Sequence, residues 1–294
     1  NKSTKTLFQI IDTLIKKNFT KKSVLISLGG GVIGDICGLA SSLYLRGLIY
    51  MHIPTTITSI VDSCIGGKNA INYKNIINSL GTYYHPKSVF IDLRIIYQMP
   101  DREYLAGIPE ILKCGLIKNN QILKLLIFNK DKILKRDPKI LNKLIYNTLK
   151  TKIFFFIKDV TENKNRLFLN FGHTFAHAFE MSTQKIYGKE ILRHGEAVGV
   201  GMLSEILYSN KALKNKIYAE CANVLNLYNL PINLKKYNFH SNIMNSTFQN
   251  LFLDKKRISN YPRYINIKRI GKPKISEMKN TNLINDVLFE IFGF

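Results

Sequence analysis

Three of the six histidines fall in one stretch of the sequence and carry its clearest chemical signal. His173 and His177 stand four residues apart, which places both on one face of a helix, and His194 is followed by Gly195 and Glu196. Two histidines and one glutamate that leave a coordination position open suit a catalytic zinc ion. We therefore expect a metal site here. A hydrogen-bonded structural role is the alternative for each histidine.

Carboxylates and cations elsewhere in the chain extend this pattern. Glu110 and Lys113 lie one helical turn apart, and no glutamate stands beside His173 in the H-E-x-x-H order of a zinc protease. Lysines and arginines around a metal favour a small polyanion such as a phosphorylated sugar acid, whereas a solvated surface charge is the alternative for each of them. The candidate cations are Lys113, Lys152, Arg166, Lys255 and Lys256.

A glycine-rich turn near the start of the chain could bind a pyrophosphate. Gly29, Gly30 and Gly31 follow an apolar run, and Gly34 and Asp35 come just before an expected helix. Glycines let the backbone approach a phosphate closely, and a helix N-terminus offers unpaired N–H groups. The spacing departs from G-x-G-x-x-G, and a carboxylate here suits a ribose hydroxyl, a nicotinamide edge or a cation better than a phosphate. A tight turn without a ligand is the alternative.

A second polar loop follows the next expected strand. It starts at Pro54, Thr55 and Thr56 and continues through Asp62 to Lys68. Small hydroxyls, two glycines and a lysine indicate an anion-binding loop, whereas Thr55 or Thr56 could instead cap a helix. Because glycine-rich turns are common, the two loops together favour a cofactor site more than either does alone.

The hydrophobic pattern divides the chain into two parts that must position these residues. Residues 1–98 alternate apolar runs with glycine-rich turns, which predicts an α/β N-terminal Rossmann-like domain, incomplete at its N-terminus. Residues 99–294 carry longer helical patterns, which predict an all-α C-terminal domain. We expect helices at 7–17, 36–45, 105–117, 122–134, 140–157, 171–181 and 197–213, and strands at 23–28, 48–53 and 89–92.

Length and composition set wider limits. The 294 residues, 46% of them apolar, are enough for one large core or two ordinary ones. No apolar run reaches the roughly 18–20 residues of a membrane span. The four cysteines lie far apart, which indicates reduced thiols in a cytoplasmic protein. The chain begins at Asn1 without a signal peptide, and we expect its natural N-terminus to be missing.

The charge balance is strongly basic, with 43 Lys+Arg against 20 Asp+Glu and a net charge of +23. These cations are spread along the chain among Ile, Asn and Phe, without a long basic block. This spread favours a drift of the overall composition toward Lys, Asn and Ile. A few of the cations would in addition bind an anionic small substrate. A nucleic-acid binder is the alternative from another class, and it predicts strongly salt-dependent retention of DNA or RNA.

Five motifs in order give the chain a resemblance to 3-dehydroquinate synthase from about Lys2 to Lys256. They are GGGVIGD at 29–35, PTT at 54–56 with VDSCIGGK at 61–68, PEILKCG at 109–115, NFGHTFAHAFE at 170–180 and HGEAVGVGM at 194–202. The resemblance implies a homodimeric lyase of the shikimate pathway that uses NAD⁺ and Zn²⁺ or Co²⁺. Such an enzyme converts 3-deoxy-D-arabino-heptulosonate 7-phosphate into 3-dehydroquinate and phosphate, and regenerates NAD⁺ within each turnover.

The resemblance also implies roles for individual positions. The family's zinc ligands match Glu110, His173 and His194, and its proton-transfer histidine matches His177. Its phosphate contacts match Lys68, Asn78 and Lys113, with Arg46 reaching in from the other subunit. Its carboxylate and hydroxyl contacts match Lys152, Arg166, Asn170, Lys255 and Lys256. Its NAD-site positions match Lys2, Gly30, Gly31, Asp35, Thr55, Thr56, Asp62, Lys68 and Asn78.

The sequence departs from the family's pattern at several points. The chain starts inside the G-E-x-x-K segment, so the family's preceding strands, which hold the adenosine end of NAD, are absent. Ile77 stands where the family usually has a lysine, and Lys164 stands where it usually has a glycine. The segment between His173 and His194 is a few residues longer than usual. The missing strands bear on NAD binding and favour a fragment of a longer protein, whereas the other three differences concern loop geometry rather than the reaction.

Two enzymes of the same fold are the closest alternatives. Another sugar-phosphate cyclase would act on a substrate without a carboxylate, and Lys152, Arg166 and Asn170 argue for the carboxylate. A metal-dependent polyol dehydrogenase would share the glycine turn and some metal ligands. It would not need the phosphate contacts at Lys68 and Lys113, and it would accumulate NADH.

Overall fold

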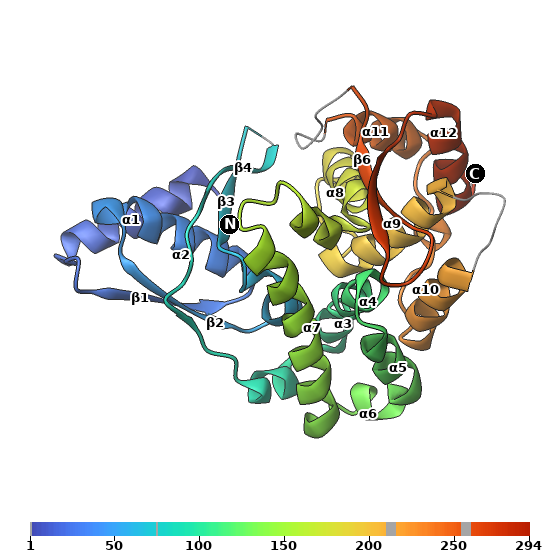
Figure 1. The fold of residues 1–294 in the computed structure, drawn as a ribbon. Helices are drawn as coiled ribbons and strands as arrows, with labels where there is room; N and C mark the ends of the chain where they lie inside the picture. The colour runs from blue at the N-terminus through green and yellow to red at the C-terminus, as the bar shows by residue number, and fades with distance from the viewer. Residues whose placement is uncertain (1, 75, 210–215, 254–259) are drawn as a thin grey trace. The chain divides into compact units, whose positions relative to one another are not determined.

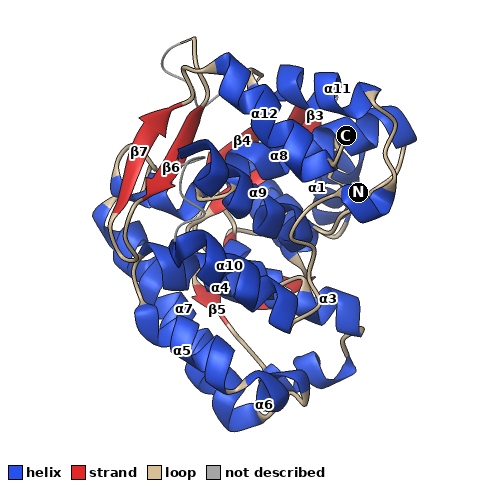
Figure 2. Cartoon of the chain, turned by 90° about the vertical axis from the view of Figure 1, so that its right-hand side faces the viewer, coloured by secondary structure: helices blue, strands red, loops and turns tan. Residues whose placement is uncertain are grey.

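The computed structural model describes residues 2–74, 76–209, 216–253 and 260–294. The chain forms two compact units, Asn1–Tyr104 and Leu105–Phe294. Helices and strands alternate in the first unit, whereas helices dominate the second (Figures 1 and 2).

A parallel sheet of three strands, in the order β1-β2-β5, forms the first unit's centre. β1 (Val24–Gly29) pairs with β2 (Ile49–Pro54) along its whole length, and β5 (Ser88–Val89) pairs with the other edge of β2. Parallel neighbours need a crossover connection, and α2 (Gly31–Leu43) supplies it between β1 and β2. Both polar loops therefore follow the carboxyl ends of adjacent strands, where ligands bind in such sheets.

Two helices cover this sheet from one side. α1 (Thr4–Lys16) starts at Ser3, whose hydroxyl accepts the N–H of Thr6 at 3.2 Å. It packs on α2, which contacts both β1 and β2 (Figure 1). The core between them contains Leu7, Ile36, Leu39, Ala40 and Ile71.

A hairpin that the sequence analysis did not predict completes the first unit. β3 (Lys68–Tyr73) pairs antiparallel with β4 (Ile76–Tyr83). Asn69, Asn72 and Asn78 interrupt the apolar residues of its strands, so hydrophobic periodicity is weak there. The shorter helical turns of this unit are η1 (Tyr44–Arg46), η2 (Ser59–Ser63) and η3 (Leu93–Gln98).

The second unit is built around α9, which is buried on nearly all sides and packs against α4, α8, α10 and α12. A helix that is surrounded in this way has apolar or small residues on all of its faces. The helices are α3 (Asp101–Leu105), α4 (Ile108–Ile117), α5 (Asn120–Phe128), α6 (Lys130–Leu134), α7 (Pro138–Lys158), α8 (His173–Tyr187), α9 (His194–Ser209), α10 (Lys216–Leu227), α11 (Asn242–Leu251) and α12 (Thr281–Phe292), with turns η4 (Asn165–Asn170) and η5 (Lys235–Tyr237).

Two long helices expected from the sequence are each divided in the structure. The one at 105–117 is interrupted at Gly107, because Pro109 favours the first turn of a new helix, α4. The one at 122–134 is interrupted at Asn129, which ends α5 and begins α6. Positions 210–213 of the helix expected at 197–213 lie outside the described residues.

The expectation of an all-α second part needs one correction. β6 (Arg263–Ile267) and β7 (Pro273–Glu277) form an antiparallel hairpin that packs on α9 (Figure 2). The strand expected at 89–92 is also shorter than predicted, because only Ser88 and Val89 pair with β2. Both differences concern short strands, in which few residues carry a periodic signal.

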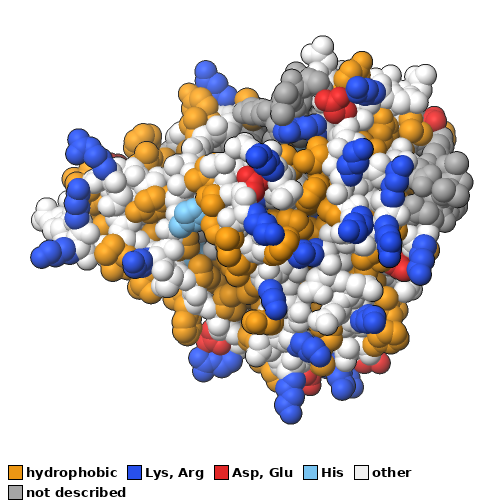
Figure 3. Space-filling view, viewed as in Figure 1, with side chains coloured by type: hydrophobic (Ala, Val, Ile, Leu, Met, Phe, Trp, Pro, Cys, Tyr) orange, Lys and Arg blue, Asp and Glu red, His pale blue; other side chains and the backbone are white. Residues whose placement is uncertain are grey.

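The surface agrees with a dispersed rather than a clustered positive charge. Lys and Arg side chains are scattered among apolar and neutral ones over the face shown in Figure 3. Among the described helices, none is long and apolar enough to cross a membrane. All four cysteines lie in the described residues, and none of them forms a disulfide.

Candidate active site

Side chains from three helices converge in the second unit. Glu110 lies on α4, and His173 and His194 are the first residues of α8 and α9. One ligand atom from each of the three lies within 4.8 Å of the other two. Glu196 has a different role, because its Oε2 accepts the N–H of Arg193 at 2.9 Å and caps α9. The carboxylate of the set is therefore Glu110.

The spacing of these ligand atoms fits a tetrahedral metal ion. Glu110 Oε1 lies 3.4 Å from His173 Nε2 and 3.3 Å from His194 Nε2. Charge-assisted hydrogen bonds are shorter, at about 2.7–2.9 Å. Tetrahedral ligands held about 2.0–2.1 Å from zinc lie about 3.3–3.4 Å from one another. Two imidazoles and one carboxylate at this spacing suit Zn²⁺ and leave a position open.

Each histidine of the set is oriented through its other ring nitrogen. His194 Nδ1 lies 2.9 Å from Glu180 Oε1, and His173 Nδ1 lies 3.3 Å from the carbonyl oxygen of Phe171. Partners of this kind aim Nε2 at the metal and raise its basicity. The sequence analysis gave Glu180 no role, although it lies two turns after His173 on the same helix.

The surrounding charges favour the metal-binding forms of Glu110 and His173, but the protonated form of His194. Burial alone would raise the pKa of Glu110, but Lys113 and His173 outweigh it and hold the pKa well below its usual value. Lys113, itself buried, forms an ion pair with Glu110. Burial, aided by Lys113, lowers the pKa of His173. Burial opposes the charge of His194 as well, but Glu180 and Glu110 hold its pKa well above the usual value. A metal would therefore displace a proton from His194.

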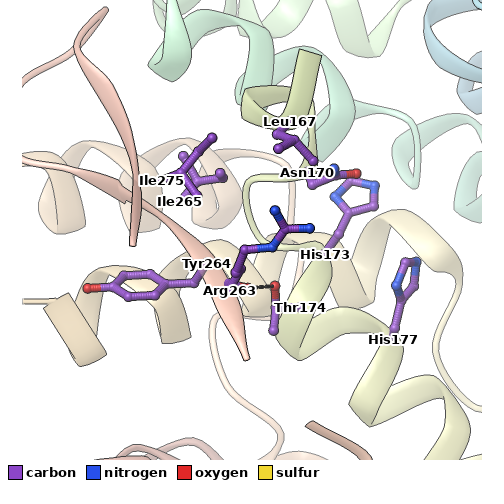
Figure 4. A pocket seen from close by; sticks show the side chains of 9 residues that line it. All are labelled: Leu167, Asn170, His173, Thr174, His177, Arg263, Tyr264, Ile265 and Ile275. Carbon is purple, nitrogen blue, oxygen red and sulfur yellow. Dashed lines mark hydrogen bonds between the residues drawn. The ribbon is translucent and has the colours of Figure 1, made fainter. Parts of the chain in front are cut away.

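A pocket opens beside His173, between α8, β6 and the turn before α8 (Figure 4). The side chains of Asn170, His173 and Arg263 face one another across it. The ring centroid of His177 lies 5.5 Å from that of His173, so His177 adjoins the set of Glu110, His173 and His194 without belonging to it. The sequence analysis missed Arg263, because no motif marks it. The lining residues are Leu167, Asn170, His173, Thr174, His177, Arg263, Tyr264, Ile265 and Ile275.

The predicted carboxylate contacts lie on α7 and in the turn before α8. Lys152 and Arg166 are both buried. Arg166 donates from Nη1 to the carbonyl of Val160 at 2.5 Å, and Asn170 donates from Nδ2 to Glu162 Oε1 at 2.7 Å. The carboxylate of Asp159 interacts electrostatically with Arg166, which offsets part of the cost of burying that cation.

The departure from the family's glycine at Lys164 leaves this turn well ordered. The carboxylate of Asp159 accepts the N–H groups of Asn163, Lys164 and Arg166 at 2.9, 2.7 and 3.0 Å. Burial opposes the charge of Asp159, but these bonds hold its pKa below the usual value. Lys164 itself has a φ of −138° and a ψ of −108°. The hydrogen bonds of Asp159 hold the turn with the lysine in place.

In the first unit, the two predicted loops form one surface at the N-terminus of α2. Gly30 is the N-cap of that helix, and no side chain caps it. A Cβ at Gly30 would lie 3.0 Å from Thr56 Cγ2, and one at Gly31 would lie 3.0 Å from Ser63 Oγ. Thr56 Oγ1 accepts the N–H of Ser59 at 3.1 Å, so Thr56 does cap the following turn. The helix N-terminus beside it keeps the backbone geometry that binds anions.

Three predicted cofactor-site residues that are distant in sequence lie together. Lys2 Nζ donates to Asp35 Oδ2 and to Asn78 Oδ1, both at 2.5 Å. The sequence analysis gives a cation as one alternative partner of the Asp35 carboxylate, and Lys2 is such a cation. Ile77, which stands where the family usually has a lysine, lies beside Asn78 and is exposed.

The remaining predicted residues occupy loops and strand ends. Thr55 donates its N–H to the carbonyl of Gly29 at 3.0 Å, and Asp62 lies in η2. Lys68 is the first residue of β3 and is exposed. Arg46 is exposed, with a φ of 62°. Lys255 and Lys256 lie outside the described residues.

Solved structures that share this fold with high TM-scores include sugar-phosphate cyclases, whereas a glycerol dehydrogenase from Sinorhizobium meliloti shares it with a lower TM-score of 0.62, at 14% identity over 100% of this chain and 82% of that one. A 2-deoxy-scyllo-inosose synthase complexed with carbaglucose-6-phosphate, NAD⁺ and Co²⁺ matches with a TM-score of 0.84 and 27% identity, over 98% of this chain and 80% of that one. A 2-epi-5-epi-valiolone synthase from Streptomyces hygroscopicus, with NAD⁺ and Zn²⁺ bound, matches with a TM-score of 0.87 and 24% identity, over 99% and 79%.

Sequence comparison identifies the particular family within this class. The N-terminal model of 3-dehydroquinate synthase matches residues 1–106, and its C-terminal model matches residues 107–257. A 3-dehydroquinate synthase from Thermodesulfovibrio yellowstonii is 38% identical over 271 residues, which is 92% of this chain and 73% of that protein. The chain belongs to the 3-dehydroquinate synthase family, which confirms the resemblance seen in the motifs.

Proposed function

We propose that this protein converts 3-deoxy-D-arabino-heptulosonate 7-phosphate into 3-dehydroquinate and phosphate. The reaction is that of a carbon–oxygen lyase which eliminates phosphate and closes a ring. The observation that carries the proposal is the convergence of Glu110, His173 and His194 at tetrahedral spacing, in a chain of this family.

The two units offer one cofactor site each. Glu110, His173 and His194 would hold Zn²⁺ or Co²⁺. The glycine turn would receive the pyrophosphate of NAD⁺ at the N-terminus of α2, whose N-cap, Gly30, has no side chain to bond the N–H groups. When bound, the metal supplies Lewis acidity towards the substrate's hydroxyls and NAD⁺ supplies reversible hydride acceptance. The other proposed NAD contacts are Lys2, Gly30, Gly31, Asp35, Thr55, Thr56, Asp62, Lys68 and Asn78.

His177 would transfer the proton of a substrate hydroxyl. Its ring centroid lies 5.5 Å from that of His173 and 6.2 Å from that of His194, and the metal-ligand set does not include it. A base held this close to the reacting hydroxyl contributes about 10²–10⁴ in rate. Because His173 and His194 would hold the metal that binds this hydroxyl, their positions would set the distance between the hydroxyl and His177.

Cations would hold the two acidic groups of the substrate. Arg166 presents a planar guanidinium suited to a carboxylate, and Lys152 and Asn170 lie on the adjoining segments. Lys255 and Lys256 would add to these contacts. By family position, Lys68, Asn78 and Lys113 would contact the phosphate, with Arg46 supplied by the second subunit of a homodimer. We further propose a cytoplasmic enzyme that uses neither nucleic acid nor membrane as a partner.

The test follows phosphate release from the heptulosonate phosphate with Zn²⁺ and a catalytic amount of NAD⁺. We expect release without accumulation of NADH, because the net reaction neither oxidises nor reduces the substrate. Release should stop on chelation of the metal and in His173→Ala. His240→Ala, which removes an exposed histidine from the same unit, should retain activity.

Other results would point to the alternatives. No release from a folded protein that binds both cofactors would move the assignment to a cyclase whose substrate lacks the carboxylate. Steady NADH formation with a polyol would indicate a dehydrogenase. Retention on DNA at about 0.1 M salt would favour the nucleic-acid binder instead.

A further inference from the structure

A buried histidine packs against the helix that follows the glycine turn of the first unit. His52, on β2, is buried, and a Cβ at Gly34, in the first turn of α2, would lie 3.0 Å from both Cε1 and Nε2 of its ring. Its Nδ1 lies 2.6 Å from Ser27 Oγ, and its Nε2 lies 3.2 Å from Ser59 Oγ. The ring therefore connects strand β1 with the loop that follows β2.

Hydroxyl groups extend these contacts in both directions. On one side, Ser27 donates to the hydroxyl oxygen of Tyr50 at 3.2 Å, and Tyr50 donates to the carbonyl oxygen of Gly34 at 2.9 Å. On the other side, Ser63 donates to Ser59 Oγ at 3.1 Å. The hydrogen-bonded groups form one continuous chain from the backbone of α2, through the imidazole, to the second polar loop.

The carbonyl oxygen at one end sets the direction of every donor in this chain. A carbonyl only accepts, so Tyr50 spends its one hydroxyl proton there and must accept from Ser27. Ser27 has then spent its own proton, and it must accept from the Nδ1–H of His52. Burial disfavours a charged ring, and a neutral ring that donates from Nδ1 accepts at Nε2. Ser59 therefore donates to Nε2 and accepts from Ser63.

The other end of the chain reaches the proposed cofactor surface at two points. A Cβ at Gly31 would lie 3.0 Å from Ser63 Oγ, so that hydroxyl borders the glycine turn. The N–H of Ser59 donates to Thr56 Oγ1 at 3.1 Å, and Thr56 borders Gly30. Ser59 therefore holds two side chains that border the turn, Thr56 through its N–H and Ser63 through its hydroxyl.

The direction of the chain decides what Ser63 can offer to a ligand. Its one proton is used on Ser59, so its oxygen has only lone pairs for other groups. The phosphate oxygens of a dinucleotide are themselves acceptors, and they would find no donor in this hydroxyl. A hydroxyl or amide group of the dinucleotide can donate to it.

We propose that His52 is a positioning residue, which fixes the hydroxyl of Ser63 as a hydrogen-bond acceptor beside the glycine turn and so orients a donor group of NAD⁺ there. The inference rests on the proposed function, because it takes NAD⁺ as the ligand of this turn. It gives His52 itself no contact with the cofactor. A histidine that only filled the core would support folding without a specific effect on NAD⁺ affinity.

The first measurement identifies the tautomer of His52 in the full chain without added cofactor. Nitrogen-15 NMR of labelled histidine distinguishes a protonated from an unprotonated ring nitrogen, and the signals that are missing in His52→Gln belong to His52. We expect Nδ1 to carry the proton of the neutral ring. A proton on Nε2 would overturn the proposal, because Ser59 could then not donate to the ring.

The second measurement is NAD⁺ affinity by isothermal calorimetry. His52→Leu removes both ring contacts, so we expect affinity to fall about tenfold as the loop loses its support. Ser63→Ala should cost a similar factor. The double variant should lose no more than the weaker of the two, because the two residues act along one chain and their effects do not add. His52→Gln keeps a donor and an acceptor, and it should stay within about threefold of wild type.

A matched control separates positioning from stability. Tyr44→Phe removes the hydroxyl of another buried tyrosine of the first unit, which donates to the carbonyl oxygen of Phe19 at 2.8 Å, and it should bind NAD⁺ like wild type. Wild-type affinity in a folded His52→Leu, additive losses in the double variant, or an equal loss in Tyr44→Phe would contradict the proposal. If His52→Leu does not fold, Ser59→Ala breaks the same chain one residue further on, with the same expected results.

An analogue of NAD⁺ identifies the donor group. In 3-acetylpyridine adenine dinucleotide, a methyl group replaces the amide nitrogen of the nicotinamide. If Ser63→Ala loses affinity for NAD⁺ but not for the analogue, the amide is the donor. An equal loss for both ligands assigns the donor to a hydroxyl of the dinucleotide, and no loss for either ligand refutes the role of Ser63.

The two measurements separate failure of this inference from failure of the proposed function. If wild type binds no NAD⁺ but Nδ1 of His52 carries the proton, the proposed function is wrong and the direction of the chain stands. If wild type binds NAD⁺ and releases phosphate while Nε2 carries the proton, the proposed function stands and the inference is wrong.

Discussion

His194 takes its orientation from Glu180, a residue two turns along α8 from His173. The carboxylate lies 2.9 Å from Nδ1, and together with Glu110 it holds the pKa of His194 well above its usual value. Glu110 is in turn balanced by Lys113 on the same helix. The proposed metal site is thus a chain of paired charges in which each ligand depends on a partner that binds no metal.

The dependence on Glu180 predicts an effect on metal affinity. Glu180→Ala should weaken Zn²⁺ binding by about 10–100-fold, because His194 loses the partner that fixes its ring. The Zn²⁺ affinity of Glu180→Gln should lie between those of wild type and Glu180→Ala, since the amide oxygen still accepts from Nδ1 but carries no charge. Chelator competition measures both constants. Affinity equal to wild type in Glu180→Ala would show that His194 is held by its backbone and helix alone.

At the scale of elements, the N-terminus of α2 shows how a turn becomes a binding surface. The carboxyl ends of β1 and β2 bring the glycine turn and the loop after Pro54 into contact, and Gly30 meets Thr56 there. A methyl group at Gly30 would lie 3.0 Å from Thr56 Cγ2, so the Thr56 side chain must give by a few tenths of an ångström if position 30 carries a side chain.

We expect Gly30→Ala to weaken NAD⁺ binding by about tenfold or more, because the pyrophosphate loses close access to the backbone. Isothermal calorimetry with NAD⁺ measures this directly. Gly199→Ala is a matched control on α9, where a new Cβ would lie 3.0 Å from Leu225 Cδ2, a contact of the same length. The proposed approach of the pyrophosphate to the backbone at Gly30 is wrong if both variants bind NAD⁺ like wild type, or if both lose NAD⁺ affinity equally.

At the scale of the whole molecule, stability depends on groups far from the metal ligands. His52, on β2, is buried between Ser27, 2.6 Å from Nδ1, and Ser59, 3.2 Å from Nε2. Burial lowers the pKa of His52. Above its unfolded pKa of about 6.5 the histidine is neutral in both states. Below that value the unfolded chain takes up a proton that the folded protein resists, so stability is lost as pH falls towards the folded pKa.

The free energy of unfolding should therefore fall between pH 7 and pH 5, by at most about 1.4 kcal/mol per pH unit from this one group. His52→Gln, which cannot titrate, should lose less stability over the same range. Urea denaturation at several pH values gives both curves, and every other titrating group is common to the two proteins. Parallel curves for the two proteins would assign the pH dependence elsewhere.

The sequence by itself determined the features that depend on near neighbours. The helix bearing His173 and His177, the strand before Gly29 and the glycine turn were all predicted, because periodicity and turn chemistry act over a few residues. The family followed from five motifs in order. Boundaries were less certain: the helix expected at 36–45 begins at Gly31, since the turn's glycines enter the helix.

Which distant residues meet is a property of the tertiary structure. Spacing left the carboxylate of the set open and the family resemblance assigned it to Glu110; the packing of α4 beside α9 brings Glu110 to the histidines and leaves Glu196 as a cap. Arg263 lies in no motif, and Glu180 ends the motif at 170–180 without a role that the pattern reveals, because the partners of both come from other elements. Close packing of α8 on α9, where Gly201 meets Gly172, is likewise a contact that a local pattern does not encode.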